Sequence, residues 1–283
     1  PAMPRLLPAR LRVCEPRAAA KIYATPVPSD RHLTALQHTR LPDDARLAAA
    51  LLGGEPASPG AGGPPSSPCP LRLLDGPPGT GKTRALVDAA CADVASGRVT
   101  GRVLVCAHSN VAVLGLYARL LESPLAEEVA LCVPPARVPD GVIVACDDPT
   151  ARRVVCATVS SRAGPRLHGL GFEAVYLDEA AQCAEACAWT LVRRELRFLT
   201  LAGDARQLRA RAASEAARAC AHDRSLMERL MAKCGHPCTT MTVQRRMHPQ
   251  IVAFPNRAFY GGALVTAPAA ERGGSAPDAA DAD

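Results

Sequence analysis

The segment GPPGTGKT at residues 76–83 constrains the fold of this 283-residue chain more than any other feature. It follows the apolar run 71–75 and precedes the helix-like segment 82–96, so it lies between a predicted strand and a predicted helix. In that context, G-x-x-x-x-G-K-[ST] loops bind phosphates through inward-turned backbone N–H groups and a helix N-terminus. The sequence therefore predicts a P-loop nucleotide-binding fold.

The chemistry of the loop predicts which of its side chains act on a nucleoside triphosphate. We expect Lys82 to bridge the β- and γ-phosphates of ATP and the Thr83 hydroxyl to ligate Mg²⁺. The alternative, a Gly/Pro turn before a capped helix, is disfavoured by the full eight-residue match. The residues expected to line the phosphates are Gly76, Pro77, Pro78, Gly79, Thr80, Gly81, Lys82 and Thr83.

Apolar strand-like segments alternate with helix-like segments after the loop. The expected strands are 71–75, 102–107, 142–146, 154–158, 174–177 and 197–202, and the expected helices include 82–96 and 110–121. This alternation predicts an α/β fold, a parallel sheet with helices on both faces.

Two adjacent acids end the apolar strand in AVYLDEAAQ (174–182). At the carboxyl end of a strand, Asp178 is placed to hold Mg²⁺, and Glu179 to orient or deprotonate the attacking water. Adjacent acids also occur at ordinary helix starts, where the helix dipole favours them. Because a phosphate loop precedes them in the same alternating pattern, we favour the catalytic interpretation.

Two glutamines further narrow the class of P-loop protein that the chain can belong to. Gln182 follows the acid pair, and Gln207 lies in LAGDARQL (201–208), just after another predicted strand. An amide at such a place can contact the γ-phosphate or the attacking water. Simple nucleotide kinases and small GTPases have no need of two such glutamines.

Five segments in this order resemble the motifs of superfamily-1 helicases. They are GPPGTGKT, CAHSNVAV (106–113), DEAAQ (178–182), GDARQL (203–208) and QRRMHPQIVAFPNRAFYGGAL (244–264). The last block is similar to the branch that contains the nonsense-mediated-decay helicase and senataxin. The resemblance covers about residues 71–265 and implies ATP- and Mg²⁺-dependent movement on single-stranded RNA or DNA.

The resemblance also assigns further residues. It implies that Arg246 reaches the γ-phosphate and that Gln207 joins Lys82, Thr83, Asp178 and Glu179 as ATPase residues.

The residues expected to contact adenine depart from the family pattern. The residue before Arg246 is Arg245, where relatives have a tyrosine, and a guanidinium could stack on adenine in its place. The adenine-reading glutamine of the family would be Gln37, although the match is loose.

The resemblance places Ser109 and Asn110 against the nucleic-acid backbone. Thr158 ends another predicted strand, where a hydroxyl could bond a phosphate. The alternative for all three is helix capping, which Ser, Asn and Thr perform often.

Composition excludes some classes of protein and leaves others open. Of 33 basic residues only three are lysines, Lys21, Lys82 and Lys233, so arginine is abundant for compositional reasons and the net charge of +6 does not predict an anionic partner. No apolar run approaches the roughly 18 residues of a membrane span. The cysteines in apolar runs (Cys106, Cys132, Cys146, Cys156) suggest reduced, buried thiols and an intracellular protein, cytoplasmic or nuclear.

Composition predicts a linker and a tail, and the resemblance implies the two RecA-like parts, which gives five segments. They are an N-terminal segment (1–52), a Gly/Pro-rich linker (53–70), a RecA-like ATPase domain (71–238), the start of a second RecA-like domain (239–266) and a disordered tail (267–283). Because later helicase motifs are missing, we expect a truncated motor that does not unwind processively by itself. The alternatives are a degraded remnant that binds ATP or nucleic acid without turnover, and another P-loop ATPase, against which the RMHP block argues.

Overall fold

The computed structural model describes residues 71–268, apart from residues 140, 143, 145, 194 and 213. The N-terminal segment with Gln37, the linker and the chain beyond Pro268 lie outside the described residues. Within the described part, no helix is both long and apolar enough to cross a bilayer.

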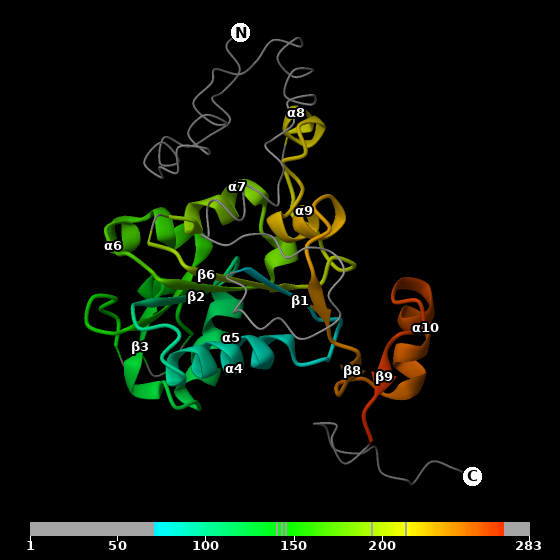
Figure 1. Ribbon diagram of the computed structural model, residues 1–283, viewed down its shortest axis with the longest axis horizontal. Coiled ribbons are helices and arrows are strands. Elements are labelled where there is room, and N and C mark those ends of the chain that lie inside the picture. The colour runs from blue at the N-terminus through cyan, green and yellow to red at the C-terminus, as the bar shows by residue number, and fades with distance from the viewer. Residues whose placement is uncertain are drawn as a thin grey trace.

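A parallel seven-stranded sheet forms the centre of the described chain, in the order β3-β4-β2-β5-β6-β1-β7 (Figure 1). Its strands are β1 (Leu71–Asp75), β2 (Val103–Ala107), β3 (Val129–Cys132), β4 (Val154–Thr158), β5 (Ala174–Asp178), β6 (Phe198–Gly203) and β7 (Cys238–Thr240). Strands β2, β4 and β5 are buried at every position, because helices remove both faces from water. The predicted α/β class is confirmed.

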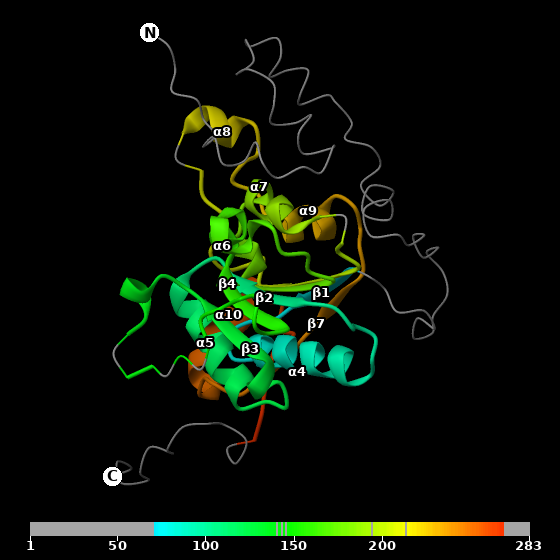
Figure 2. The same ribbon diagram turned by 90° about the vertical axis from the view of Figure 1, so that its left-hand side faces the viewer.

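Helices cover both faces of this sheet, with α4 and α5 on one side and α6, α7 and α9 on the other (Figures 1 and 2). The α-helices are α4 (Lys82–Ala95), α5 (Asn110–Leu121), α6 (Pro165–His168), α7 (Glu185–Ala188), α8 (Glu215–Ala219), α9 (Leu226–Ala232) and α10 (Pro249–Phe259). Short 3₁₀ helices are η2 (Ala126–Glu128), η3 (Pro135–Arg137), η4 (Val159–Ala163), η5 (Ala180–Gln182) and η6 (Trp189–Leu191). Each face has its own apolar core, with Leu86 and Leu116 in one and Leu167 and Met227 in the other.

One predicted strand, 142–146, is wrong. Its described residues lie outside any strand, and Val142 and Val144 are each 37% exposed. Instead β3, which was not predicted and whose residues are all buried, forms the sheet edge beside β4. The Cys146 carbonyl accepts the Leu131 N–H at 2.8 Å, so the segment touches the outer edge of β3, but its described residues form no strand there.

The thiol prediction holds with one exception. Cys106, Cys132 and Cys156 are buried, and every cysteine in the described part of the chain is free. Cys146 is only half-buried because it lies in the segment that does not form a strand.

After Thr240 the chain leaves the sheet and forms a second, smaller unit. Two short strands, β8 (Val243–Gln244) and β9 (Val265–Thr266), pair in parallel across helix α10. The N–H of Ala267 donates to Gln244 O at 2.9 Å, so the ordered pairing reaches into the segment predicted as a tail. Figure 1 shows this second unit beside the sheet end formed by β1 and β7.

The strand register sets the position of the polar residues. Asp75 at the end of β1 lies beside Gly203 of β6, and Ala107 at the end of β2 lies beside Asp178 of β5. Because all these strands are parallel, their carboxyl ends meet along one edge, where ligands of open α/β sheets bind.

Candidate active site

The phosphate loop joins β1 to α4 with a backbone that only small residues tolerate. Gly79 and Gly81 have φ angles of 75° and 85°, in the left-handed region. A Cβ at Gly76 would lie 2.7 Å from Lys82 Cβ, so a side chain there would fill the space that the loop encloses. The Thr80 hydroxyl donates to Pro77 O at 2.7 Å and braces the turn.

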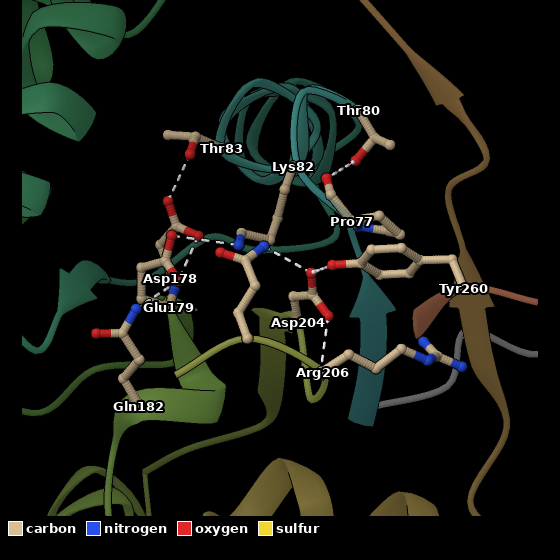
Figure 3. Close-up of polar contacts among 11 residues, drawn as sticks. Pro77, Thr80, Lys82, Thr83, Asp178, Glu179, Gln182, Asp204, Arg206 and Tyr260 are labelled. Carbon is tan, nitrogen blue, oxygen red and sulfur yellow. Dashed lines mark hydrogen bonds and ion pairs between the residues drawn. The ribbon is translucent and has the colours of Figure 1, made fainter. Parts of the chain in front are cut away.

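Lys82 starts α4 and is 8% exposed. Its Nζ lies 3.2 Å from Oε1 of Glu179 (Figure 3). The structure thus brings together the predicted phosphate-binding cation and the predicted base, which are 97 residues apart in the sequence. A phosphate entering the loop would compete with Glu179 for this ammonium group.

Thr83 and Asp178 form a second contact. The Thr83 hydroxyl donates to Oδ2 of Asp178 at 2.7 Å, and the other carboxylate oxygen accepts the Glu179 N–H at 2.9 Å. Burial raises the pKa of Asp178, and the hydrogen bond from Thr83 and the charge of Lys82 oppose that rise. A hydroxyl beside a carboxylate is the hard oxygen donor set that Mg²⁺ prefers, so these two residues fit the metal predicted from the sequence.

Glu179 has a φ of 52°, a left-handed conformation that is uncommon outside glycine. Its Oε2 accepts a hydrogen bond from Nε2 of Gln182 at 3.2 Å, while Lys82 holds the other oxygen. Such backbone strain costs about 1–3 kcal/mol and clusters at functional sites. The hydrogen bond from Gln182 and the ion pair with Lys82 together orient the carboxylate of this predicted base.

The second unit contacts the phosphate loop directly. The Arg245 N–H donates to Gly79 O at 2.8 Å, and a Cβ at Gly79 would lie 2.7 Å from Arg246 Cβ. Gln244 shapes this turn: its fully buried Oε1 accepts the N–H groups of Arg246 at 3.0 Å and Met247 at 2.8 Å. Both arginines were predicted from the sequence, but Gln244 was not, because only its burial distinguishes it from a surface glutamine.

The predicted sensor Gln207 lies beside a buried acid. Its Nε2 donates to Oδ2 of Asp204 at 2.6 Å. The same oxygen accepts the Tyr260 hydroxyl at 2.8 Å (Figure 3), and Arg206 pairs with Asp75 at 3.0 Å. Tyr260 and Arg206 were not predicted, since nothing local in their segments indicates a contact across more than 50 residues.

Comparison with known proteins identifies the family. Two AAA-domain family models match residues 61–135 with 150–215, and residues 222–279. The chain is 32% identical to the probable helicase MAGATAMA 3 of Arabidopsis thaliana over 60% of its length and 25% of the relative's. It is 30% identical to the regulator of nonsense transcripts 1 of Caenorhabditis elegans over 69% of its length and 22% of the relative's. It is 32% identical to the DNA-binding protein SMUBP-2 of Mesocricetus auratus over 70% of its length and 26% of the relative's.

The chain belongs to the superfamily-1 helicases of the nonsense-mediated-decay helicase and senataxin branch. Its P-loop fold is the RecA-like fold of that family. The chain spans about a quarter of the length of the curated relatives that it matches.

The residues predicted to contact nucleic acid lie at the ends of two strands. The Ser109 side chain accepts the Ala112 N–H at 3.2 Å and caps α5, of which Asn110 is the first residue. Thr158 accepts the Ser161 N–H at 3.2 Å and caps η4. Both hydroxyls therefore perform the capping role that was the alternative, and both lie at the carboxyl edge of the sheet.

Proposed function

We propose that this chain hydrolyses ATP and couples the reaction to movement along single-stranded nucleic acid, RNA or DNA, as the motor portion of a helicase. The observation that carries the proposal is the pair of contacts Thr83–Asp178 and Lys82–Glu179 at the carboxyl edge of the sheet. These contacts link a phosphate loop to a metal-binding acid and a base, the set that phosphoryl transfer to water requires.

In this proposal, each side chain has one task in hydrolysis. Lys82 and the loop N–H groups hold the β- and γ-phosphates. Thr83 and Asp178 hold Mg²⁺, which when bound offsets the phosphate charge. Glu179 accepts the proton of the attacking water, with its carboxylate oriented by Gln182.

Two further residues act on the γ-phosphate in this proposal. Gln207 contacts the γ-phosphate or the attacking water. Arg246, whose backbone lies against Gly79, stabilises the charge that develops on the transferred group. Arginines in that role raise turnover by about 10³–10⁵.

The remaining assignments concern the adenine of ATP and the nucleic-acid strand. Arg245 and Gln37 contact adenine, and Ser109, Asn110 and Thr158 contact the nucleic-acid backbone through hydroxyl, amide and N–H groups. Such contacts carry no sequence information, so binding is sequence-independent. A relative named as DNA-binding supports DNA as a substrate, and one named for nonsense transcripts supports RNA.

The test is the ATPase rate with and without single-stranded RNA or DNA. Strand-stimulated hydrolysis that Lys82→Ala abolishes and the exposed control Lys233→Ala leaves unchanged would support the motor. ATP binding without any turnover would defeat it and support the degraded-remnant alternative.

A further inference from the structure

Tyr260 belongs to the second unit, yet its phenol reaches the first sheet. It follows α10, and its hydroxyl donates to Oδ2 of Asp204, directly after β6, at 2.8 Å (Figure 3). Tyr260 is 9% exposed and Asp204 is 1% exposed. A hydrogen bond to a buried carboxylate is among the stronger kinds, so this contact ties the seating of the second unit to the end of β6.

The same carboxylate oxygen holds Gln207. The Gln207 Nε2 donates to Oδ2 of Asp204 at 2.6 Å, whereas Oδ1 accepts the Arg206 N–H at 3.0 Å. Two donors on one oxygen share its negative charge, and each therefore weakens the attraction for the other. When the phenol is in place, Asp204 holds the Gln207 amide less tightly than it would alone.

Arg206 holds the ring of Tyr260 in the position from which its hydroxyl reaches Asp204. The Arg206 guanidinium lies 5.7 Å from the ring centroid, a cation–π distance. Its Nη1 is 3.0 Å from Oδ2 of Asp75, which is 1% exposed at the end of β1. The Arg206 side chain that contacts the phenol is therefore held by β1, the strand that leads into the phosphate loop.

We propose that Tyr260 is a positioning residue for Gln207: seating its phenol on Asp204 lowers the cost of turning the glutamine amide toward a bound γ-phosphate. The use of that motion rests on the proposed ATPase function, but the Tyr260–Asp204–Gln207 link is measurable without nucleotide. Through this link, the sensor glutamine of the first unit becomes ready only when the second unit is seated.

The first test is a cycle of melting temperatures for Tyr260→Phe, Gln207→Ala and the double variant. Because removing one donor strengthens the other, the double variant is expected to lose roughly 1–3 °C more than the two single losses combined. Additive losses would overturn the proposal.

A matched control exists between β5 and α4. The Tyr176 hydroxyl donates to Oδ2 of Asp93 at 2.5 Å, and Arg72 contacts both residues. Tyr176→Phe removes the same kind of hydrogen bond and should lower the melting temperature, but its effect should add simply to that of Gln207→Ala.

The second test measures the affinities of a non-hydrolysable ATP analogue and of ADP for the full chain, using fluorescent nucleotides. Tyr260→Phe is expected to weaken the ATP analogue about fivefold or more while leaving ADP unchanged, because only the analogue carries the γ-phosphate that Gln207 contacts. In the Gln207→Ala background the same substitution should have no further effect. A further loss there, or equal losses for both nucleotides, would mean that Tyr260 acts by another route and would contradict the proposal.

The two proposals fail separately. If the wild-type chain binds neither nucleotide, the proposed ATPase is wrong, while the melting-temperature cycle still decides whether Tyr260 and Gln207 are linked.

Discussion

Gly79 of the phosphate loop lies directly against Arg246 of the second unit: a Cβ at Gly79 would be 2.7 Å from the Cβ of Arg246. The Arg245 N–H donates to the Gly79 carbonyl at 2.8 Å. The loop that would hold the phosphates is therefore also the surface on which the second unit rests, and its glycine serves both contacts.

Gly79→Ala should consequently cost more than its backbone conformation alone requires. A Cβ in the left-handed region costs about 1–2 kcal/mol, and at Gly79 it would also push against Arg246. We expect a lower melting temperature and a roughly 10²-fold loss of ATP turnover, because the added methyl group displaces Arg246 from the phosphate loop.

Gly97→Ala is the matched control for this substitution. Gly97 has a φ of 71°, and a Cβ there would meet no atom within 4 Å. The Gly97→Ala variant should lose thermal stability only through its backbone conformation and should keep its rate of ATP turnover. Equal losses in the two variants would show that the contact between Gly79 and Arg246 is unimportant.

Glu179→Gln should separate binding from hydrolysis. The carboxylate lies 3.2 Å from Lys82 Nζ and competes with phosphate for it, so the neutral amide should increase ATP affinity. Turnover should fall about 10²–10⁴-fold, because the proposed base is gone. Equilibrium binding and single-turnover hydrolysis measure the two effects, and the exposed Glu122→Gln serves as control. Unchanged affinity would show that Glu179 does not compete for Lys82.

Asp178→Asn should stabilise the chain in the absence of Mg²⁺ and nucleotide. Burial raises the pKa of Asp178 in the folded state, so the folded chain binds its proton more tightly than the unfolded chain does. That contribution to stability is present at low pH and is lost as the pH rises through the raised pKa. The variant should therefore melt at a higher temperature than wild type at neutral pH.

The same substitution has a pH signature that identifies the cause. The difference in melting temperature should shrink as the pH falls toward the ordinary aspartate value of about 4. Addition of Mg²⁺ and ATP should stabilise the wild type far more than Asp178→Asn. A difference that does not change with pH would point to packing instead of charge.

Gln244→Leu should loosen the second unit. Leucine removes the acceptor of the Arg246 and Met247 N–H groups, and each such hydrogen bond contributes about 0.5–1.5 kcal/mol. Thermal melting should show this loss, and ATP turnover should fall with it because Arg246 moves. Gln250→Leu, at an exposed position of α10, should be nearly neutral. If both variants melt alike, the buried amide does not hold the turn.

The elements that could be predicted are those whose signal is local. The strands at Leu71–Asp75 and Val154–Thr158 and the helix at Asn110–Leu121 match their predicted bounds, because an apolar run between turn residues marks each of them. The false strand at 142–146 carries the same apolar signal as the real strand β3. Local pattern cannot rank the two, since the choice depends on which one fits beside β4.

The candidate site divides in the same way. Lys82, Thr83, Asp178 and Glu179 are recognisable because the residue type and the strand end that carries it are adjacent in the sequence. Gln182 was expected to contact phosphate or water, and only the structure showed that it holds the Glu179 carboxylate. That contact depends on the left-handed backbone of Glu179, a conformation that the residue type does not predict.

The sequence by itself determined the parallel α/β class, the phosphate loop and the acids at the end of β5, because periodicity and loop chemistry are properties of short segments. Only the tertiary structure decided that Tyr260 shares Asp204 with Gln207 and that Gln244 supports Arg246 above Gly79. These contacts join residues brought together by strand order and by the seating of one unit on another. Apolar strands can pair with many neighbours, so their order follows from the packing of the whole chain.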